Sequence, residues 1–224
     1  MVAEPFNERE GQIRIDLPGA HALFTTVPWG DVRESHAWIG AQLGVSIARA
    51  QQVHGDAVLE VSALPPQDGL VGEGDAILTA RPGTAPMVLS ADCVPVLIAG
   101  SGAVAAVHAG WKGLYAGVIE RTAERLRALA PDATLQAAIG PAAGVCCYAV
   151  GEELHARFAQ RGLDLRRGQN LDLKAIAALQ LKLAGVATVH DVGLCTICAD
   201  PARLFSYRRD GPRAGRQGAL VWLS

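Results

Sequence analysis

Hydrophobic and polar positions divide the chain into short apolar runs and longer segments in which apolar residues recur every three or four positions. The short runs are rich in Val, Ile, Leu and Ala and are bounded by Gly, Pro or Asp, which is typical of buried strands. They cover Ala57–Val61, Ala76–Thr79, Pro86–Ser90, Val94–Ala99, Val104–His108 and Leu135–Ile139. Helical spacing predicts helices over Gly117–Leu129, Gly151–Arg161 and Leu173–Leu183.

The mixture of strands and helices predicts an α/β fold, or a layered α+β one, with a mixed sheet core and flanking helices. No internal repeat or low-complexity linker divides the sequence, so we expect one domain over residues 1–224. The C-terminal stretch combines a β-rich start at Leu204, a loop dense in Gly and Arg, and a final apolar run, Ala219–Leu223. We expect this stretch to form a hairpin that closes the sheet.

Composition and charge narrow the class of protein. The net charge of −2 and the pI near 6.3 give no cationic field for nucleic acid or an anionic membrane, and neither partner is expected. The first twenty residues carry charges where a signal peptide needs an apolar run, so we expect a cytoplasmic protein. Five cysteines in that compartment are reduced thiols, each a candidate for a ligand, a nucleophile or a packing residue.

Three apolar runs end at residues that can carry chemistry. His54 lies in QVHG at the expected end of a short strand, Asp92 and Cys93 separate two aliphatic runs, and His108 ends a third. Each residue alone has an ordinary structural explanation. Together, two imidazoles and a thiolate suit zinc, and three protein ligands leave the open fourth position of a catalytic site. Metal ligation or nucleophilic catalysis would account for both Cys93 and Asp92.

The remaining cysteines form two short groups, Cys146–Cys147 and Cys195-x-x-Cys198. They are compatible with a four-thiolate zinc site or a redox pair. Adjacent cysteines rarely bind one ion together, and a second C-x-x-C pair is missing. The preferred interpretation is that these cysteines pack near the site.

A cationic loop is the candidate for anion binding. It contains four arginines, Arg208, Arg209, Arg213 and Arg216, whose guanidinium groups suit phosphate or carboxylate, although a solvated charged loop would look the same. Lys112 adds a cation at the expected N-terminus of a helix. We therefore expect Arg208, Arg216 and Lys112 to bind an anionic substrate such as phosphate.

Five segments carry a resemblance to a known family. They are QVHG, ADCVPVL, VHAGWKG, IGPAAGVCCYAVG, and CTIC followed by FSYRRDGPRAGRQ. In this order and spacing, from about Gln51 to the C-terminus, the chain resembles the YfiH/laccase-domain family. The resemblance implies a CNF1/YfiH-like fold and one zinc ion held by His54, Cys93 and His108, with copper as the alternative metal.

The resemblance also implies a function. Family members are associated with purine nucleoside phosphorylase activity, including methylthioadenosine phosphorolysis, and with adenosine deamination. Purine nucleosides and phosphate are then the expected partners of a monomeric enzyme in which Cys93 and Asp92 are catalytic.

Three other functions remain open. A copper-dependent polyphenol oxidase would need many paired imidazoles, whereas the chain has six histidines and no His-x-His pair. A Cys–His hydrolase acting on cell-wall or peptide amides would use Cys93 as nucleophile and His108 or His54 as base. The third is a noncatalytic, zinc-stabilised binding protein.

The N-terminal part departs from the family pattern. Val27 stands where the family has an arginine after FTT, and an Asn-Leu-Gly stretch before the first histidine motif is not recognisable. Because the three candidate ligands are unaffected, this departure bears more on substrate choice and rate than on the metal.

Overall fold

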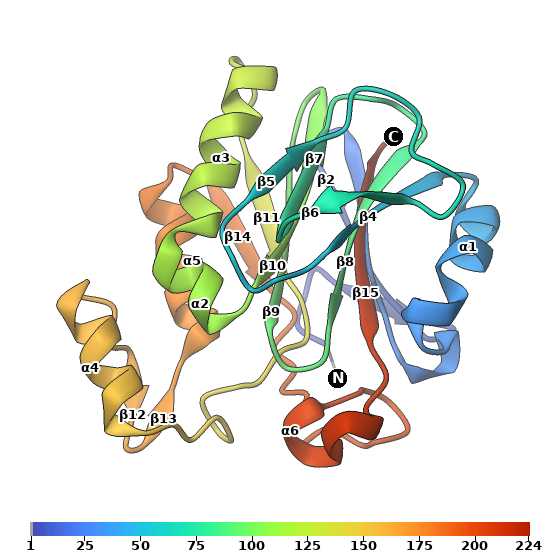
Figure 1. Ribbon diagram of the computed structural model, residues 1–224. Helices are drawn as coiled ribbons and strands as arrows, with labels where there is room; N and C mark the ends of the chain where they lie inside the picture. Colours follow the sequence, from blue (N-terminus) through green and yellow to red (C-terminus); the bar gives the residue numbers. More distant parts are fainter. Residues whose placement is uncertain (1) are drawn as a thin grey trace.

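The computed structural model describes residues 2–224, which form two β-sheets packed face to face with helices on both outer sides (Figure 1). The seven-stranded sheet has the spatial order β1 (Asn7–Arg9), β2 (Gln12–Leu17), β3 (Ala20–Thr25), β15 (Gln217–Leu223), β8 (Thr84–Ser90), β4 (Ser46–Gln51) and β6 (Leu70–Glu73). The six-stranded sheet has the order β14 (Thr188–Asp191), β11 (Gln136–Ile139), β9 (Val94–Gly100), β10 (Ala103–Ala109), β7 (Ala76–Thr79) and β5 (Val58–Glu60). Both sheets contain parallel and antiparallel pairs, as the predicted mixed sheet requires.

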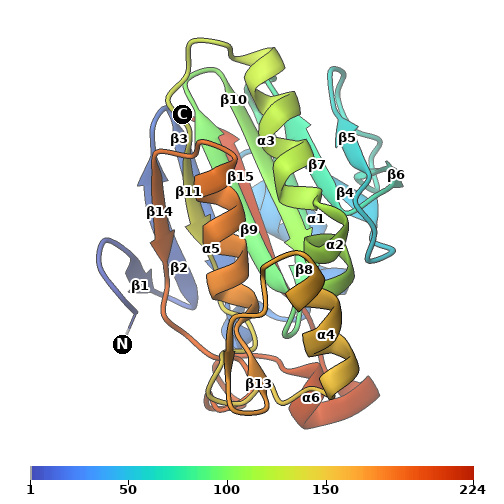
Figure 2. The same ribbon diagram turned by 90° about the vertical axis from the view of Figure 1, so that its left-hand side faces the viewer.

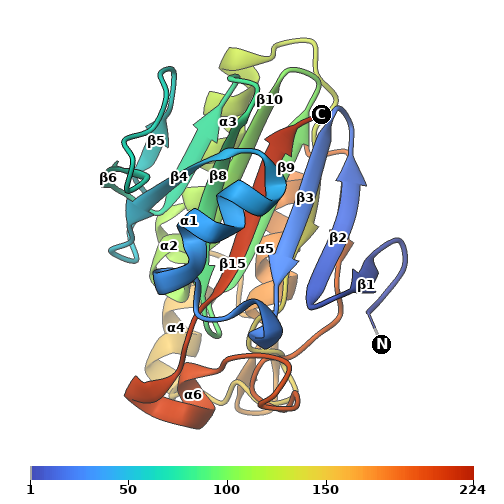
Figure 3. The same cartoon turned by 90° about the vertical axis from the view of Figure 1, so that its right-hand side faces the viewer.

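The helices complete a four-layer arrangement. They are α1 (Val32–Leu43), α2 (Trp111–Ala116), α3 (Val118–Leu129), α4 (Glu152–Gln160), α5 (Leu173–Leu183) and α6 (Tyr207–Asp210), with short 3₁₀ turns η1 (Val27–Trp29) and η2 (Gly211–Arg213). Helices α2, α3 and α5 cover the outer face of the six-stranded sheet (Figure 2), and α1 covers that of the seven-stranded sheet (Figure 3). A separate two-stranded ribbon, β12 (Arg166–Arg167) and β13 (Asn170–Leu171), lies beside α4.

Strands β9 and β10 form the centre of the core, and every residue of both is buried. Successive side chains of β9 point to opposite faces, so Val96 packs with Leu126 and Ile176 under the helices, while Leu97 packs with Phe24 between the sheets. Burying one such aliphatic side chain contributes about 1.5–3 kcal/mol. Burial on both faces explains why these strands appear in the sequence as uninterrupted apolar runs.

The predicted C-terminal hairpin is wrong. Strand β15 pairs with β3 and β8, and the chain before it enters α6, where the Ser206 side chain accepts a hydrogen bond from the Arg209 N–H (3.2 Å). The Gln217 side chain binds both backbone groups of Phe205, at 2.6 Å and 3.2 Å. Because the N–H and C=O groups of Phe205 already have hydrogen-bond partners in the Gln217 side chain, they do not require pairing with a neighbouring strand.

None of the helices within residues 2–224 combines the length and the apolar run that crossing a lipid bilayer demands.

Candidate metal centre

The structure brings His54, Cys93 and His108 together, and residues of α6 line the cavity beside His54 and Cys93. Strand β4 runs parallel to β8, Cys93 lies in the turn between β8 and β9, and the end of β10 pairs with the start of β9. The topology therefore collects three segments that are far apart in sequence. One ligand atom from each residue lies within 4.8 Å of the other two.

The two histidines of the site differ in their exposure to solvent. Their ring centroids are 4.9 Å apart and their planes are nearly perpendicular; His108 is buried, whereas His54 is exposed. His54 lies three residues beyond the end of β4, not at the strand end that the sequence predicts. A site with a buried inner ligand and an exposed outer one has the open side that an exchangeable fourth ligand requires.

Asp75, which the sequence analysis missed, holds both histidines. Its fully buried carboxylate accepts hydrogen bonds from His108 Nδ1 (2.8 Å) and from the backbone N–H groups of Val53 (3.2 Å), His54 (2.9 Å) and Gly55 (2.7 Å). Binding Nδ1 leaves Nε2 of His108 for a metal, as in carboxylate–histidine–zinc triads. The backbone bonds also hold His54 at φ +60°, an uncommon conformation for a residue with a side chain.

Hydrogen bonding controls the charges at the site. Burial opposes ionisation of the Cys93 thiol, but hydrogen bonds with His108 and His54 outweigh it and lower its pKa to about 6. Burial also disfavours a charged His108, but Asp75 and Cys93 raise its pKa to about 9. For Asp75, the hydrogen bonds with His108 and Gly55 overcome burial and lower the pKa of the carboxyl. Without a metal, the three groups form a chain of alternating charge.

Space for an ion is provided at Gly110. A Cβ atom built on this glycine would lie 3.1 Å from Cys93 Sγ, 3.2 Å from His54 Cδ2 and 3.7 Å from His108 Cε1. The absence of a side chain here keeps open the volume among the three ligands. Together with a thiolate and two imidazoles, this volume fits zinc.

Asp92 is buried beside Cys93, and both of its carboxylate oxygens have partners. Thr196 Oγ1 donates to Oδ1 (2.6 Å) and the Arg208 N–H donates to Oδ2 (2.6 Å). Asp92 has φ +98°, which these bonds help to hold. Its contacts are those of a residue that positions the neighbouring loops, and its predicted catalytic role remains a prediction.

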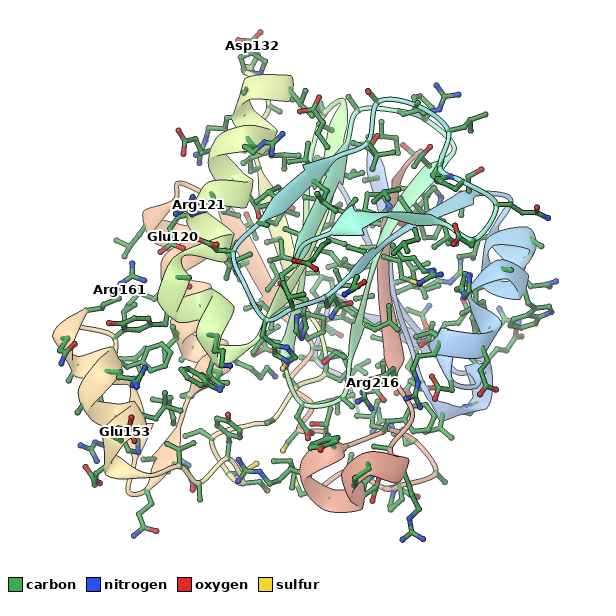
Figure 4. All side chains as sticks on the ribbon, in the orientation of Figure 1. Glu120, Arg121, Asp132, Glu153, Arg161 and Arg216 are labelled. Atoms are coloured by element: carbon green, nitrogen blue, oxygen red, sulfur yellow. The ribbon has the colours of Figure 1, made fainter. Side chains whose placement is uncertain are left out.

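A cavity of about 320 Å³ opens beside the three candidate ligands. Its lining includes His54 and Cys93, the two predicted arginines Arg208 and Arg216, and the aromatic rings of Tyr148 and Tyr207. Figure 4 shows Arg216 close to the start of β15, above α6. The cavity thus combines cations for an anion with aromatic faces for a planar group.

Lys112 lies elsewhere. It is the second residue of α2, as predicted, but its side chain is exposed, its ammonium group lies 5.7 Å from the centre of the Trp111 ring, and it is not among the residues that line the cavity. Arg209 is also directed away, because it binds Asp210 (2.7 Å) and the backbone oxygens of Thr196 (3.0 Å) and Ala199 (3.1 Å). Of the predicted cations, Arg208 and Arg216 are those that the structure brings to the site.

A second cavity of about 460 Å³ adjoins the first and shares Tyr148 and Arg208 with it. Trp111 and two residues of α4, Glu153 and Arg157, also line this second cavity; Figure 4 shows Glu153 on that helix. The two cavities give room for a ligand larger than a purine base.

The other four cysteines also lie together, with their sulfurs within 4.8 Å of one another. The packing interpretation is wrong for Cys146 and Cys198, since both are exposed. Burial opposes ionisation of Cys195, but backbone N–H groups of Cys198, Gly144 and Ile197 lower its pKa to about 7.

Fold and site define an α/β protein with a candidate catalytic metal centre of two histidines and a cysteine, set beside an arginine-lined cavity. The family model described as "Multi-copper polyphenol oxidoreductase laccase" matches residues 29–224. The chain belongs to this family, and the resemblance to YfiH/laccase-domain proteins is confirmed.

Relatives and solved structures agree with this assignment. A Xylella fastidiosa protein named purine nucleoside phosphorylase is 41% identical over 187 residues, covering 77% of this chain and 70% of the relative. A Neisseria meningitidis crystal structure superposes with a TM-score of 0.80 at 28% identity, covering 96% of this chain and 99% of that one. The crystal structure of Bacillus licheniformis YfiH has the same fold, with a TM-score of 0.84 at 23% identity over 99% and 100% of the two chains.

Proposed function

We propose that this protein is a zinc-dependent purine nucleoside phosphorylase that also phosphorolyses methylthioadenosine and deaminates adenosine. The observation that carries the proposal is the joint lining of one cavity by His54, Cys93, Arg208 and Arg216 beside two tyrosines. The purine nucleoside phosphorylase name of relatives up to 41% identical supports the substrate class.

Phosphorolysis requires hydrogen phosphate to attack the anomeric carbon of the ribose while the bond to the purine nitrogen breaks. The proton released by the phosphate passes to the departing purine, giving free base and ribose 1-phosphate. Arg208 and Arg216 neutralise the phosphate and orient one oxygen toward that carbon. Tyr148 and Tyr207 provide flat surfaces for the base. Asp92 fixes the backbone of Arg208 and so positions one of these cations. Binding by Lys112 would require the substrate to extend beyond the 320 Å³ cavity.

Zinc supplies a Lewis acid to such a site when it is bound. His108 presents Nε2 because Asp75 accepts from Nδ1, and the lowered pKa of Cys93 keeps its sulfur in the thiolate form that binds metal. His54 completes the set from the exposed side. For deamination, the same pocket holds C6 of adenine near a water molecule, and water replaces the amino group as ammonia leaves.

The test is turnover of adenosine, inosine, guanosine and methylthioadenosine, each with and without phosphate, followed by chromatographic separation of products. We expect base release that depends on phosphate, and conversion of adenosine to inosine that does not. Cys93→Ala removes a ligand and should lose both activities together with the zinc of this site. No turnover of any of the four nucleosides by protein with full zinc occupancy would contradict the proposal.

A second candidate is the Cys–His hydrolase, favoured by the hydrogen-bonded order Cys93, His108, Asp75. In this function the Cys93 thiolate attacks an amide carbonyl, and His108 donates a proton to the leaving amine. Hydrolysis of peptide or cell-wall amides that survives chelation but is lost on thiol alkylation would support it. Activity lost on chelation and restored by Zn²⁺ would support the phosphorylase.

Copper chemistry of the multicopper type receives less support. Of the six histidines, only His54 and His108 belong to a group of candidate metal ligands within residues 2–224. A single site of two histidines and one cysteine is too small for a four-copper array.

A further inference from the structure

The four cysteines outside the described site come from two loops that the sheet places side by side. Strands β11 and β14 are parallel neighbours, and the chain after each leaves the same end of the sheet. The two loops remain paired, because Ala142 forms a parallel bridge with Cys195 and the Thr196 N–H donates to the Ala142 oxygen (2.9 Å). Cys146 and Cys147 are thereby brought to Cys195 and Cys198.

The spacing of the sulfurs matches a closed tetrahedral site. All four lie within 4.8 Å of one another, and Cys146 Sγ is 3.8 Å from Cys198 Sγ. A zinc ion with Zn–S bonds of about 2.3 Å has its sulfurs about 3.8 Å apart, the edge of the tetrahedron. A disulfide has an S–S bond of about 2.05 Å, and the structure has all four thiols free.

The backbone around the sulfurs is also shaped for a ligand set. The Gly144 N–H donates to Cys195 Sγ (3.2 Å), a contact that stabilises negative charge on sulfur. A Cβ atom on Gly144 would lie 3.1 Å from Cys195 Cβ and 3.3 Å from Cys146 Sγ, so a side chain would separate the two cysteine pairs. Packing does not account for the cluster, since Cys146 and Cys198 are exposed.

We propose that Cys146, Cys147, Cys195 and Cys198 bind one zinc ion in a structural tetrathiolate site, distinct from the site of His54, Cys93 and His108. Four protein ligands leave no open position, so this ion takes no part in the chemistry. The chain then carries two zinc ions, one more than the sequence predicts.

The location of the cluster gives this ion a role in shaping the catalytic cavity. Tyr148, which follows Cys147 directly, lines the cavity. Thr196, between the other two ligands, binds Asp92 beside Cys93. Tetrathiolate zinc joins these two loops and so fixes the wall that carries Tyr148.

The test is metal analysis of the full chain, stripped under reducing conditions and reconstituted with Zn²⁺. We expect two zinc ions per chain in the wild type and one in the double variant Cys146→Ser/Cys198→Ser, whose substitutions are both at exposed positions. Cys93→Ala should also retain one ion. Co²⁺ in place of zinc distinguishes the two: the intense thiolate-to-cobalt absorption of a four-sulfur site should persist in Cys93→Ala and disappear in the double variant.

Three results would overturn the proposal. One is a wild type with a single zinc ion that Cys93→Ala loses. Another is three thiols, instead of all five, in protein purified without reductant, then chelated and denatured, because a disulfide would remove two. The last is iron with inorganic sulfide in place of zinc. If circular dichroism shows the double variant to be unfolded, the Co²⁺ spectrum of Cys93→Ala decides the matter alone.

Discussion

Replacing Asp75 with asparagine should weaken the metal centre without removing any of its ligands. The carboxylate accepts four hydrogen bonds, three from backbone N–H groups and one from His108. An asparagine presents one oxygen and directs an NH₂ group toward donors. Losing the partner of a buried charged pair costs about 3–5 kcal/mol, and losing the support of a metal-binding histidine lowers metal affinity about 10–100-fold.

Two measurements test Asp75→Asn. Competition with a chromophoric chelator should show a zinc dissociation constant raised by about 10–100-fold, measured in the Cys146→Ser/Cys198→Ser background so that only one site reports. Thermal unfolding of the metal-free protein should occur about 10 °C lower, as a loss of a few kcal/mol implies for this size of chain. Asp56→Asn is the control, because Asp56 lies on the loop that carries His54 but pairs with the exposed Arg121 (2.9 Å). Unchanged zinc affinity in folded Asp75→Asn would refute the proposed support of His108.

Three further predictions concern space, charge and protonation. Gly110→Ala should fold but lose zinc from the site of His54, Cys93 and His108, because the added Cβ would lie 3.1 Å from the Cys93 sulfur. Metal analysis measures the zinc content of this variant, and normal zinc occupancy would contradict the prediction. Arg216→Ala should lower kcat/KM for phosphate about tenfold or more. Arg213→Ala is the control, because Arg213 lies in the same loop but does not line the cavity, and its kcat/KM should not change. Equal effects of the two substitutions would argue against the proposed phosphate contact of Arg216. In metal-free protein, iodoacetamide should alkylate Cys93 with a half-maximal rate near pH 6, because the lowered pKa keeps the thiolate present down to that pH. A pH midpoint of the alkylation rate near the ordinary thiol value of 9.0 would show that the imidazoles do not stabilise the thiolate.

The sequence predicts best those strands whose two faces are both buried. Strands β7, β9 and β10 appear as apolar runs because packing on each side excludes polar residues. Polar residues at the ends of such runs are conspicuous, which is why Cys93 before β9 and His108 near the end of β10 could be selected. His54 follows the partly exposed strand β4 and was selected from the QVHG segment. The N-terminal strand β2 was missed, although QIRIDL alternates between buried and exposed positions.

The sequence does not show which residues far apart in the chain become hydrogen-bond or ligand neighbours in the fold. Asp75 is 33 residues from His108 and 21 from His54 in the chain, and its only signal was an acidic residue directly before the apolar β7 strand. A buried carboxylate at that point requires partners, but their identity depends on which strand ends meet. The cysteine cluster has the same origin, since only the parallel pairing of β11 and β14 brings its two halves together.

Asp92 connects the two clusters of candidate metal ligands. One of its oxygens is bound by Thr196, which lies between Cys195 and Cys198, and the other by the N–H of Arg208, which lines the cavity. A carboxylate with both oxygens occupied is poorly suited to move protons, and the two bonds help to hold the positive φ of Asp92. The conformation of the loop that carries Cys195 and Cys198 and the position of Arg208 are therefore linked through the side chain of Asp92. This linkage gives a physical reason for the proposed structural ion to lie near the proposed catalytic one.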